Sequence, residues 1–66
     1  MHVIIDGIPE EIEAGLSLGQ LIEERGEDSH DLIVELNHCH ILRHNLAAAI
    51  IQEGDEVEII HPAFGG

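Results

Sequence analysis

The sequence has no lysine, tryptophan or tyrosine, and it is strongly acidic. Arg25 and Arg43 are its only strongly basic residues against 14 Asp and Glu residues, so the 66-residue chain has a formal net charge of -12 with histidine neutral. Proteins that bind phosphate backbones need a basic patch, which this composition does not provide. An anionic membrane surface would also repel the chain. We therefore expect neither nucleic acid nor a membrane as a partner.

Long apolar runs and paired cysteines are also missing. The longest apolar run, residues 46–51, is far shorter than the roughly 20 residues that a membrane span needs. The start of the chain lacks the basic segment and following apolar stretch that are typical of a signal peptide. Cys39 is the single cysteine, so it can form neither an internal disulfide nor an all-cysteine zinc or iron–sulfur site. These absences favour a cytoplasmic protein.

Aromatic residues are almost absent, since Phe64 is the only one. Hydrophobic residues nevertheless make up 44% of the chain, so we expect a small folded domain with an aliphatic core rather than a disordered acidic chain. A core in so short a chain leaves little room for an enclosed active site. The sequence also offers no glycine-rich phosphate loop and no recognisable nucleophile–base pair. A carrier, adaptor or binding module is therefore favoured over an enzyme.

The N-terminal segment predicts a β-hairpin. Residues 2–6 alternate in the way expected of a strand, and residues 8–14 are expected to return as a second strand. Asp6-Gly7 between them is a strong signal for a two-residue turn. Pro9 cannot donate a backbone hydrogen bond, so the second strand is expected at an edge of the sheet.

A short helix is predicted to follow this hairpin. Ser17 is a good N-cap residue, and Gln20 follows three positions later, which predicts a capping box. Leu16 is expected to pack on Leu21 as a hydrophobic staple, and Gly26 is the predicted stop. A helix of about two turns is not stable alone, so we expect it to pack on a sheet. Its apolar face comprises Leu18, Leu21 and Ile22, with Glu23, Glu24 and Arg25 facing water.

The C-terminal half predicts three further strands. A turn at residues 37–39 separates the first two, and Asn45 is expected to cap a helical turn over residues 46–50. Val57 and Ile59 are expected to face inward on the last strand. The resulting order of two strands, a helix and three strands indicates an α+β sheet with a helix on one face. The three strands are predicted at residues 32–37, 40–43 and 56–60.

A short tail, residues 61–66, follows the last predicted strand. Pro62 stiffens the beginning of this tail, and Gly65 and Gly66 carry no side chains. A terminal carboxylate on such a tail can enter a narrow channel in another protein and react there, because no side chain collides with the walls or shields the carbonyl. We therefore expect residues 1–60 to form a folded domain that carries a flexible tail.

Several segments together resemble a known family. They are residues 3–7, the capped helix at 16–23, Val-Glu-Leu-Asn at 34–37, Glu-Gly-Asp-Glu-Val-Glu-Ile-Ile at 53–60, and the final Gly65-Gly66. In this order, and at this length, the chain resembles the sulfur carriers of the ThiS/MoaD type, ThiS more closely. The resemblance implies an α+β, ubiquitin-like β-grasp fold: a mixed sheet of about four to five strands, one main helix packed on one face, and a protruding C-terminal Gly-Gly tail.

The resemblance also implies a function. A ThiF/MoeB-like enzyme would use ATP to adenylate the Gly66 carboxylate, and sulfur from a cysteine desulfurase relay would then convert it to a thiocarboxylate. The carrier would donate this sulfur to a biosynthetic enzyme, with thiazole synthase of thiamin synthesis the first choice. It would bind no cofactor itself and would be a substrate of the activating enzyme. Molybdopterin or another metabolite as the sulfur acceptor, and a ubiquitin-like protein modifier, are the alternatives.

Two features depart from the ThiS pattern. ThiS-like chains commonly place glycine after the asparagine of the second hairpin, where this chain has His38-Cys39-His40. His38, His40 and His44 are candidate metal ligands, but alternation along a strand would put His38 and His40 on one face and Cys39 on the other. A metal-binding adaptor is therefore a weaker alternative, and we expect no metal site. The second departure is Phe64 beside the glycines, a candidate anchor in a partner's cleft.

The outer face of the sheet is expected to dock on the activating enzyme. If Val57 and Ile59 face the helix, their neighbours on the last strand face outward. Apolar side chains rimmed by carboxylates are typical of a docking surface, and the carboxylates would speed association with a basic partner. The docking candidates are Ile4, Leu42, Ile60, Glu56 and Glu58.

Overall fold

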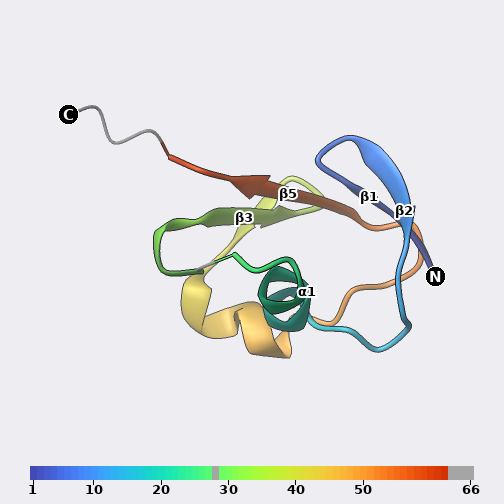
Figure 1. The fold of residues 1–66 in the computed structure, drawn as a ribbon, viewed down its shortest axis with the longest axis horizontal. Helices are drawn as coiled ribbons and strands as arrows, with labels where there is room; N and C mark the ends of the chain where they lie inside the picture. The colour runs from blue at the N-terminus through green and yellow to red at the C-terminus, as the bar shows by residue number, and fades with distance from the viewer. Residues whose placement is uncertain (28, 63–66) are drawn as a thin grey trace.

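The structure, a computed structural model, describes residues 1–27 and 29–62. It contains a five-stranded mixed sheet with the strand order β2-β1-β5-β3-β4, and the helices α1 and η2 cover one face of that sheet (Figure 1). This arrangement confirms the predicted α+β sheet with one main helix. The elements are β1 (His2–Ile5), β2 (Ile8–Glu11), α1 (Leu18–Glu24), η1 (Ser29–Asp31), β3 (Ile33–Leu36), β4 (Cys39–Ile41), η2 (Arg43–Ala48) and β5 (Glu56–Ile60), where η marks a 3-10 helix.

The strand β5 occupies the middle of the sheet. It pairs in parallel with β1 on one side and antiparallel with β3 on the other. The strands β2 and β4 form the two edges, which agrees with the edge position predicted from Pro9. The last strand in the sequence is therefore hydrogen-bonded on both sides.

Two tight turns close the hairpins. Asp6 and Gly7 have φ values of 51° and 80°, and Asn37 and His38 have φ values of 51° and 68°. Positive φ at both central residues defines the type I′ turn, whose twist matches that of the flanking strands. The second turn is therefore one residue shorter than predicted, and β4 begins at Cys39.

The helix α1 begins and ends as its sequence predicts. The Ser17 hydroxyl accepts a hydrogen bond from Gln20 N (3.1 Å), and the Gln20 side chain accepts one from Ser17 N (2.9 Å), which completes the capping box. At the other end, Gly26 has a φ of 71°, and the amides of Gly26 and Glu27 donate to the carbonyls of Glu23 and Ile22. These two bonds form a Schellman motif, which satisfies carbonyls that the helix itself leaves free.

Aliphatic side chains form the core, as the composition predicts. The residues buried between sheet and helices are Val3, Ile5, Leu16, Leu18, Leu21, Ile22, Val34, Leu46, Ile51, Val57 and Ile59. None of the buried residues among those described is aromatic. In the described part of the chain, no helix is long and apolar enough to cross a membrane.

The predicted cap at Asn45 is wrong. The helical segment η2 begins after Leu42 and no side chain caps it, while Asn45 lies inside it and donates its backbone amide to the Leu42 carbonyl (2.8 Å). Leu46 is buried in the core, so burial of this side chain rather than a capping bond positions the segment. Helix η2, at Arg43–Ala48, therefore begins before the predicted range of 46–50 and overlaps its first part.

Four predicted strands are longer or later than the observed ones. The strand predicted at 2–6 ends at Ile5, because Asp6 belongs to the turn. The strand predicted at 8–14 ends at Glu11, because its partner β1 begins at His2, which is opposite Glu11. The strand predicted at 32–37 is shorter by one residue at each end, since Asn37 already belongs to the turn. Strand β4 occupies Cys39–Ile41 in place of 40–43.

Candidate functional site

The outer face of β5 carries three of the five predicted docking residues. Val57 and Ile59 are buried against the helices, so Glu56, Glu58 and Ile60 lie on the opposite face of the sheet. Glu56 is opposite Ile4 of β1, and Ile60 is opposite Ile33 of β3. Ile4 therefore lies beside Glu56 at the start of β5, and Ile60 lies at the other end of the strand, beyond Glu58.

The apolar part of this face is centred on Ile60. Ile33 and Ile60 form a cross-strand pair, and they are 37% and 38% exposed. Leu42 is 50% exposed and lines a separate hollow of about 380 Å³ at the β4 edge, together with His40, Ile41, Asn45, Ala48 and Ala49. The sequence-based candidates did not include Ile33. The alternation of Leu32, Val34 and Leu36 along its strand was the signal that places it outward.

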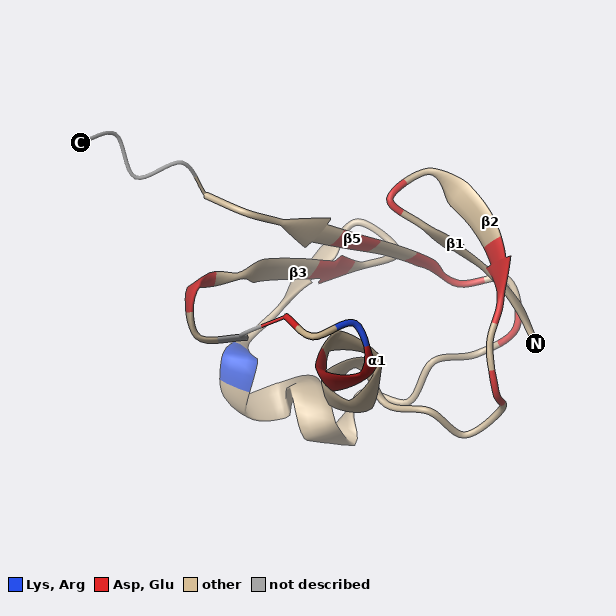
Figure 2. Cartoon of the chain, viewed as in Figure 1, with Lys and Arg blue, Asp and Glu red and all other residues tan. Residues whose placement is uncertain are grey.

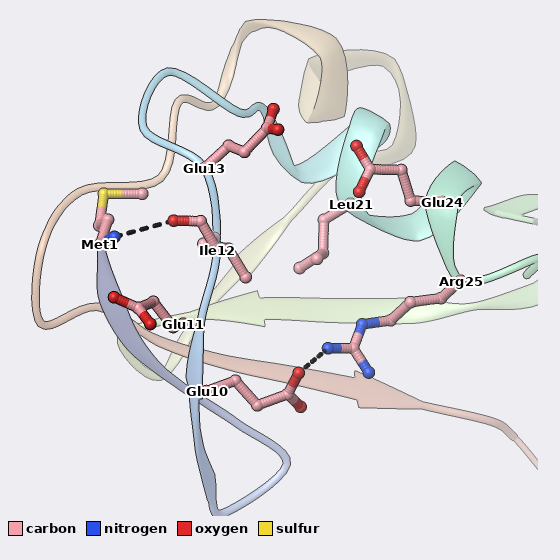
Figure 3. A pocket seen from close by; sticks show the side chains of 8 residues that line it. All are labelled: Met1, Glu10, Glu11, Ile12, Glu13, Leu21, Glu24 and Arg25. Atoms are coloured by element: carbon pink, nitrogen blue, oxygen red, sulfur yellow. Dashed lines mark hydrogen bonds and ion pairs between the residues drawn. The ribbon is translucent and has the colours of Figure 1, made fainter.

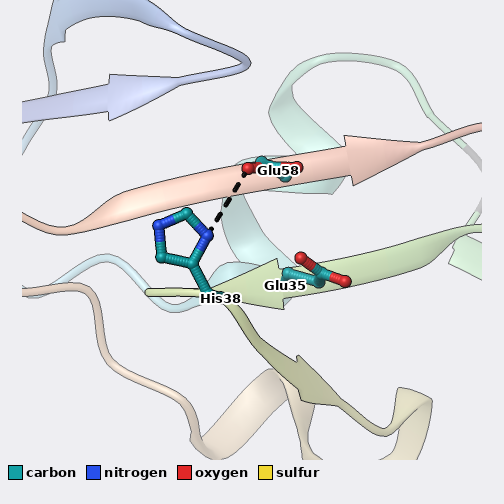
Figure 4. A group of neighbouring side chains, drawn as sticks. All are labelled: Glu35, His38 and Glu58. Atoms are coloured by element: carbon teal, nitrogen blue, oxygen red, sulfur yellow. Dashed lines mark ion pairs between the residues drawn. The ribbon is translucent and has the colours of Figure 1, made fainter.

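A group of carboxylates covers the centre of the face. Glu35 of β3 is directly opposite Glu58 of β5, and Glu56 lies two residues before Glu58 on the same strand. His38 lies over β5 from the adjoining turn: its Nε2 is 3.1 Å from Glu56 Oε2 and its Nδ1 is 3.9 Å from Glu58 Oε1 (Figure 4). The two predicted docking glutamates are therefore both in contact distance of one imidazole.

The candidate metal ligands do not gather as a histidine cluster. His40 lies opposite Glu35 on β4, and His44 lies in η2. Among the described residues, a group with potential ligand atoms within 4.8 Å of one another is formed by Glu35, His38 and Glu58. The structure thus joins His38 to two glutamates rather than to the other histidines. Cys39 is exposed and has no disulfide partner.

The basic residues lie away from this face. Arg25 and Arg43, the two arginines of the chain, are on the side of the sheet that the helices cover, whereas carboxylates run along β2, β3 and β5 (Figure 2). Arg25 pairs with Glu10, which ties the end of α1 to β2. The outer face is therefore a surface without lysine or arginine, suited to a basic partner.

A second hollow lies between β2 and α1. It has a volume of about 620 Å³, and the Arg25–Glu10 pair crosses one end of it (Figure 3). The N-terminal amino group donates to the Ile12 carbonyl (2.8 Å) at the other end. Four of its lining side chains are glutamates, so it suits no anionic ligand. It is lined by Met1, Glu10, Glu11, Ile12, Glu13, Leu21, Glu24 and Arg25.

The chain leaves the sheet at the apolar end of the docking face. Strand β5 ends at Ile60, and the next residue, His61, places its Nε2 2.8 Å from Glu27 Oε2. The tail residues with predicted chemical roles, Phe64, Gly65 and Gly66, lie outside the described residues.

Comparison with known proteins assigns the family. The model of the ThiS family matches residues 3–66. The chain belongs to the ThiS family. The match runs over nearly the whole chain and includes the final glycines, and it confirms the resemblance found in the sequence.

Solved structures of ThiS proteins share the fold. The crystal structure of the thiamine biosynthesis protein ThiS from Geobacter metallireducens superposes with a TM-score of 0.88 at 25% identity, covering all of both chains. The solution structure of a thiamine biosynthesis protein from the same organism gives a TM-score of 0.82 at 25% identity, covering this whole chain and 88% of the other. These likenesses confirm the β-grasp fold.

A thiazole synthase is also similar to this ThiS-family chain. The thiazole synthase of Magnetococcus marinus is 32% identical over 66 residues. The match covers this whole chain but only 20% of the relative, so the chain spans about a fifth of the length of that protein.

Proposed function

We propose that this protein is the sulfur carrier for formation of the thiamine thiazole, with the Gly66 carboxylate as the position that carries sulfur. The observation that supports this most is the ThiS family match, because it extends through Gly65 and Gly66. The carrier is a substrate of its partners and not a catalyst. The modification of Gly66 takes place in the cytoplasm, where the partner enzyme uses ATP.

In the proposed mechanism, a ThiF/MoeB-like enzyme transfers AMP from ATP to the Gly66 carboxylate. A carboxylate is a poor acyl donor, and adenylation gives it a good leaving group. The outer sulfur of a persulfide on the cysteine desulfurase relay then attacks the acyl adenylate, and AMP leaves. A second thiol reduces the resulting acyl disulfide, which forms a disulfide on the relay and releases the Gly66 thiocarboxylate. Two glycines suit this chemistry, since neither has a Cβ that would obstruct a narrow active-site channel.

A thiazole synthase is the proposed acceptor of the sulfur. In the Magnetococcus marinus relative, a segment like this chain forms part of a polypeptide named thiazole synthase. The presence of a carrier-like segment within a thiazole synthase polypeptide supports an interaction between the carrier and a thiazole synthase. It favours the thiamine pathway over molybdopterin as the destination.

The outer face of β5 is the proposed docking surface for the activating enzyme. Ile33 and Ile60 would supply apolar contact next to the point where the chain leaves the sheet. Glu56 and Glu58 would steer a basic partner toward that contact, as complementary charges raise association rates. Phe64 is proposed as an anchor in the partner's cleft.

Intact-mass spectrometry tests the carrier function. The chain ending at Gly66 is incubated with the ThiF-like enzyme, the desulfurase, cysteine and ATP of its own organism. We expect a mass gain equal to sulfur in place of one oxygen, and none when ATP is omitted. A chain lacking Gly65-Gly66 should show the same denaturation curve but no gain. An unchanged mass of the complete chain with active partners would rule out the proposal.

A further inference from the structure

The outer face of the sheet brings together three side chains that can each bind a metal ion. Glu35 comes from β3, Glu58 from β5 and His38 from the turn after β3, and their potential ligand atoms lie within 4.8 Å of one another (Figure 4). Sheet register creates this group, because Glu35 and Glu58 are direct cross-strand partners. Residues far apart in sequence are thus held side by side by the backbone.

The group contains more negative charge than its surroundings neutralise. Like charges directly opposite each other on a sheet are destabilising, and Glu56 adds a third carboxylate beside the Glu35–Glu58 pair. The chain has no lysine, and its two arginines are on the helical side of the sheet (Figure 2). Among the described side chains, the potential cations at these carboxylates are two histidines: His38 beside Glu56 and Glu58, and His40, the cross-strand partner of Glu35 on β4. A bound cation would remove this repulsion.

The turn holds His38 in place. The Asn37 side chain donates to Asp55 Oδ1 (3.0 Å) and accepts from Glu56 N (2.9 Å), so the turn is fixed to the start of β5. His38 itself has a φ of 68°, a region in which glycine is favoured and other residues are strained. The backbone at His38 is therefore constrained, and its imidazole lies over the glutamates.

The two imidazole nitrogens face different carboxylates. Nδ1 faces Glu58 at 3.9 Å, and Nε2 lies 3.1 Å from Glu56. With its proton on Nε2, the ring offers a free lone pair at Nδ1 and directs its N–H to a carboxylate. This is the carboxylate–histidine–metal arrangement that orients metal-binding histidines.

We propose that Glu35, Glu58 and Nδ1 of His38 bind a first-row divalent transition-metal ion such as Zn²⁺, with Glu56 orienting the imidazole. One nitrogen and carboxylate oxygens suit Zn²⁺ and its neighbours, whereas Mg²⁺ and Ca²⁺ prefer oxygen ligands alone. Tetrahedral Zn²⁺ places ligand atoms about 3.3 Å apart, closer than the 3.9 Å between His38 Nδ1 and Glu58 Oε1, so these side chains would rotate toward one another on binding. Three protein ligands leave one position for water or a partner's side chain.

Calorimetric titration of the complete, tag-free and metal-free chain tests the site. We expect Zn²⁺ to bind with one-to-one stoichiometry and a large excess of Mg²⁺ not to displace it. Glu58→Gln and His38→Gly should each weaken Zn²⁺ binding by more than about tenfold, and Glu56→Gln by about tenfold, the effect typical of a residue that orients a ligand. His44→Gln and Cys39→Ser are matched controls that should bind Zn²⁺ as the unmodified chain does.

The His38→Gly variant separates loss of a ligand from loss of the fold. Glycine adopts the positive φ at this position without strain. This variant should therefore have a denaturation midpoint at least as high as that of the unmodified chain, although it binds Zn²⁺ more weakly. Unchanged Zn²⁺ affinity in His38→Gly, equal loss in His44→Gln, or displacement by Mg²⁺ would each overturn the proposal. The titration involves neither Gly66 nor ATP, so its outcome is independent of the sulfur-carrier function.

Discussion

The backbone at His38 leads to a prediction about stability. His38 has a φ of 68° in the Asn37-His38 turn, whereas His40, two residues later, lies in β4 and has no positive φ. Glycine should therefore stabilise the protein at position 38 and destabilise it at position 40. Alanine at each position provides the reference, because it removes the imidazole and keeps the Cβ.

The magnitude follows from the two backbone terms. A residue with a Cβ in the left-handed region lowers the free energy of unfolding by roughly 1–2 kcal/mol. Glycine lowers it by about 0.5–1 kcal/mol, because glycine has greater freedom in the unfolded chain. The difference makes His38→Gly more stable than His38→Ala by about 0.5–1 kcal/mol. In strand β4, where no strain is relieved, His40→Gly should be less stable than His40→Ala by about 0.5–1 kcal/mol.

Urea denaturation in EDTA measures all four variants without a contribution from bound metal. A difference of 1 kcal/mol corresponds to roughly 4–8 °C in the midpoint of thermal unfolding for a domain of this size, so calorimetry gives an independent value. If the positive φ at position 38 is strained, the sign of the glycine–alanine difference must reverse between positions 38 and 40. If His38→Gly is no more stable than His38→Ala, the positive φ carries no strain and the reasoning fails.

Three further substitutions test the helix and its packing by the same urea assay. Leu18 is fully buried, so Leu18→Ala should cost about 2–5 kcal/mol; a loss below 1 kcal/mol would contradict its place in the core. Ser17→Ala removes the buried cap of α1 and should cost about 1–2 kcal/mol, whereas equal stability would mean that the bond to Gln20 contributes nothing. Gly19→Ala should stabilise by about 0.5–1 kcal/mol through helix propensity, because the added Cβ would lie 3.4 Å from Ala47 N, an ordinary contact; destabilisation would show that α1 and η2 cannot adjust.

Features that depend on neighbours in the chain could be predicted from the sequence. The Ser17–Gln20 capping box and the Asp6-Gly7 turn are formed by residues at most three positions apart, and both are present. The inward positions of Val57 and Ile59 followed from simple alternation. In each case the determining interaction is local, so the sequence contains all the information needed.

Features that depend on sheet register could not be predicted. The pairing of Glu35 with Glu58 requires that β3 and β5 be neighbours, and no pattern within either segment indicates this. The group formed by these residues and His38 was therefore missed, although His38 itself was a candidate. The Asn45 cap was wrong for a related reason, since burial of Leu46 in the assembled core positions η2.

The central position of β5 has a mechanical consequence. Force applied at the C-terminal end of the chain enters β5 along its length, where β1 holds it on one side and β3 on the other. The hydrogen bonds of both ladders are then loaded together in shear, and they cannot open one at a time as they would in a peeled edge strand. A pull on the C-terminal end of β5 is therefore opposed by both ladders at once.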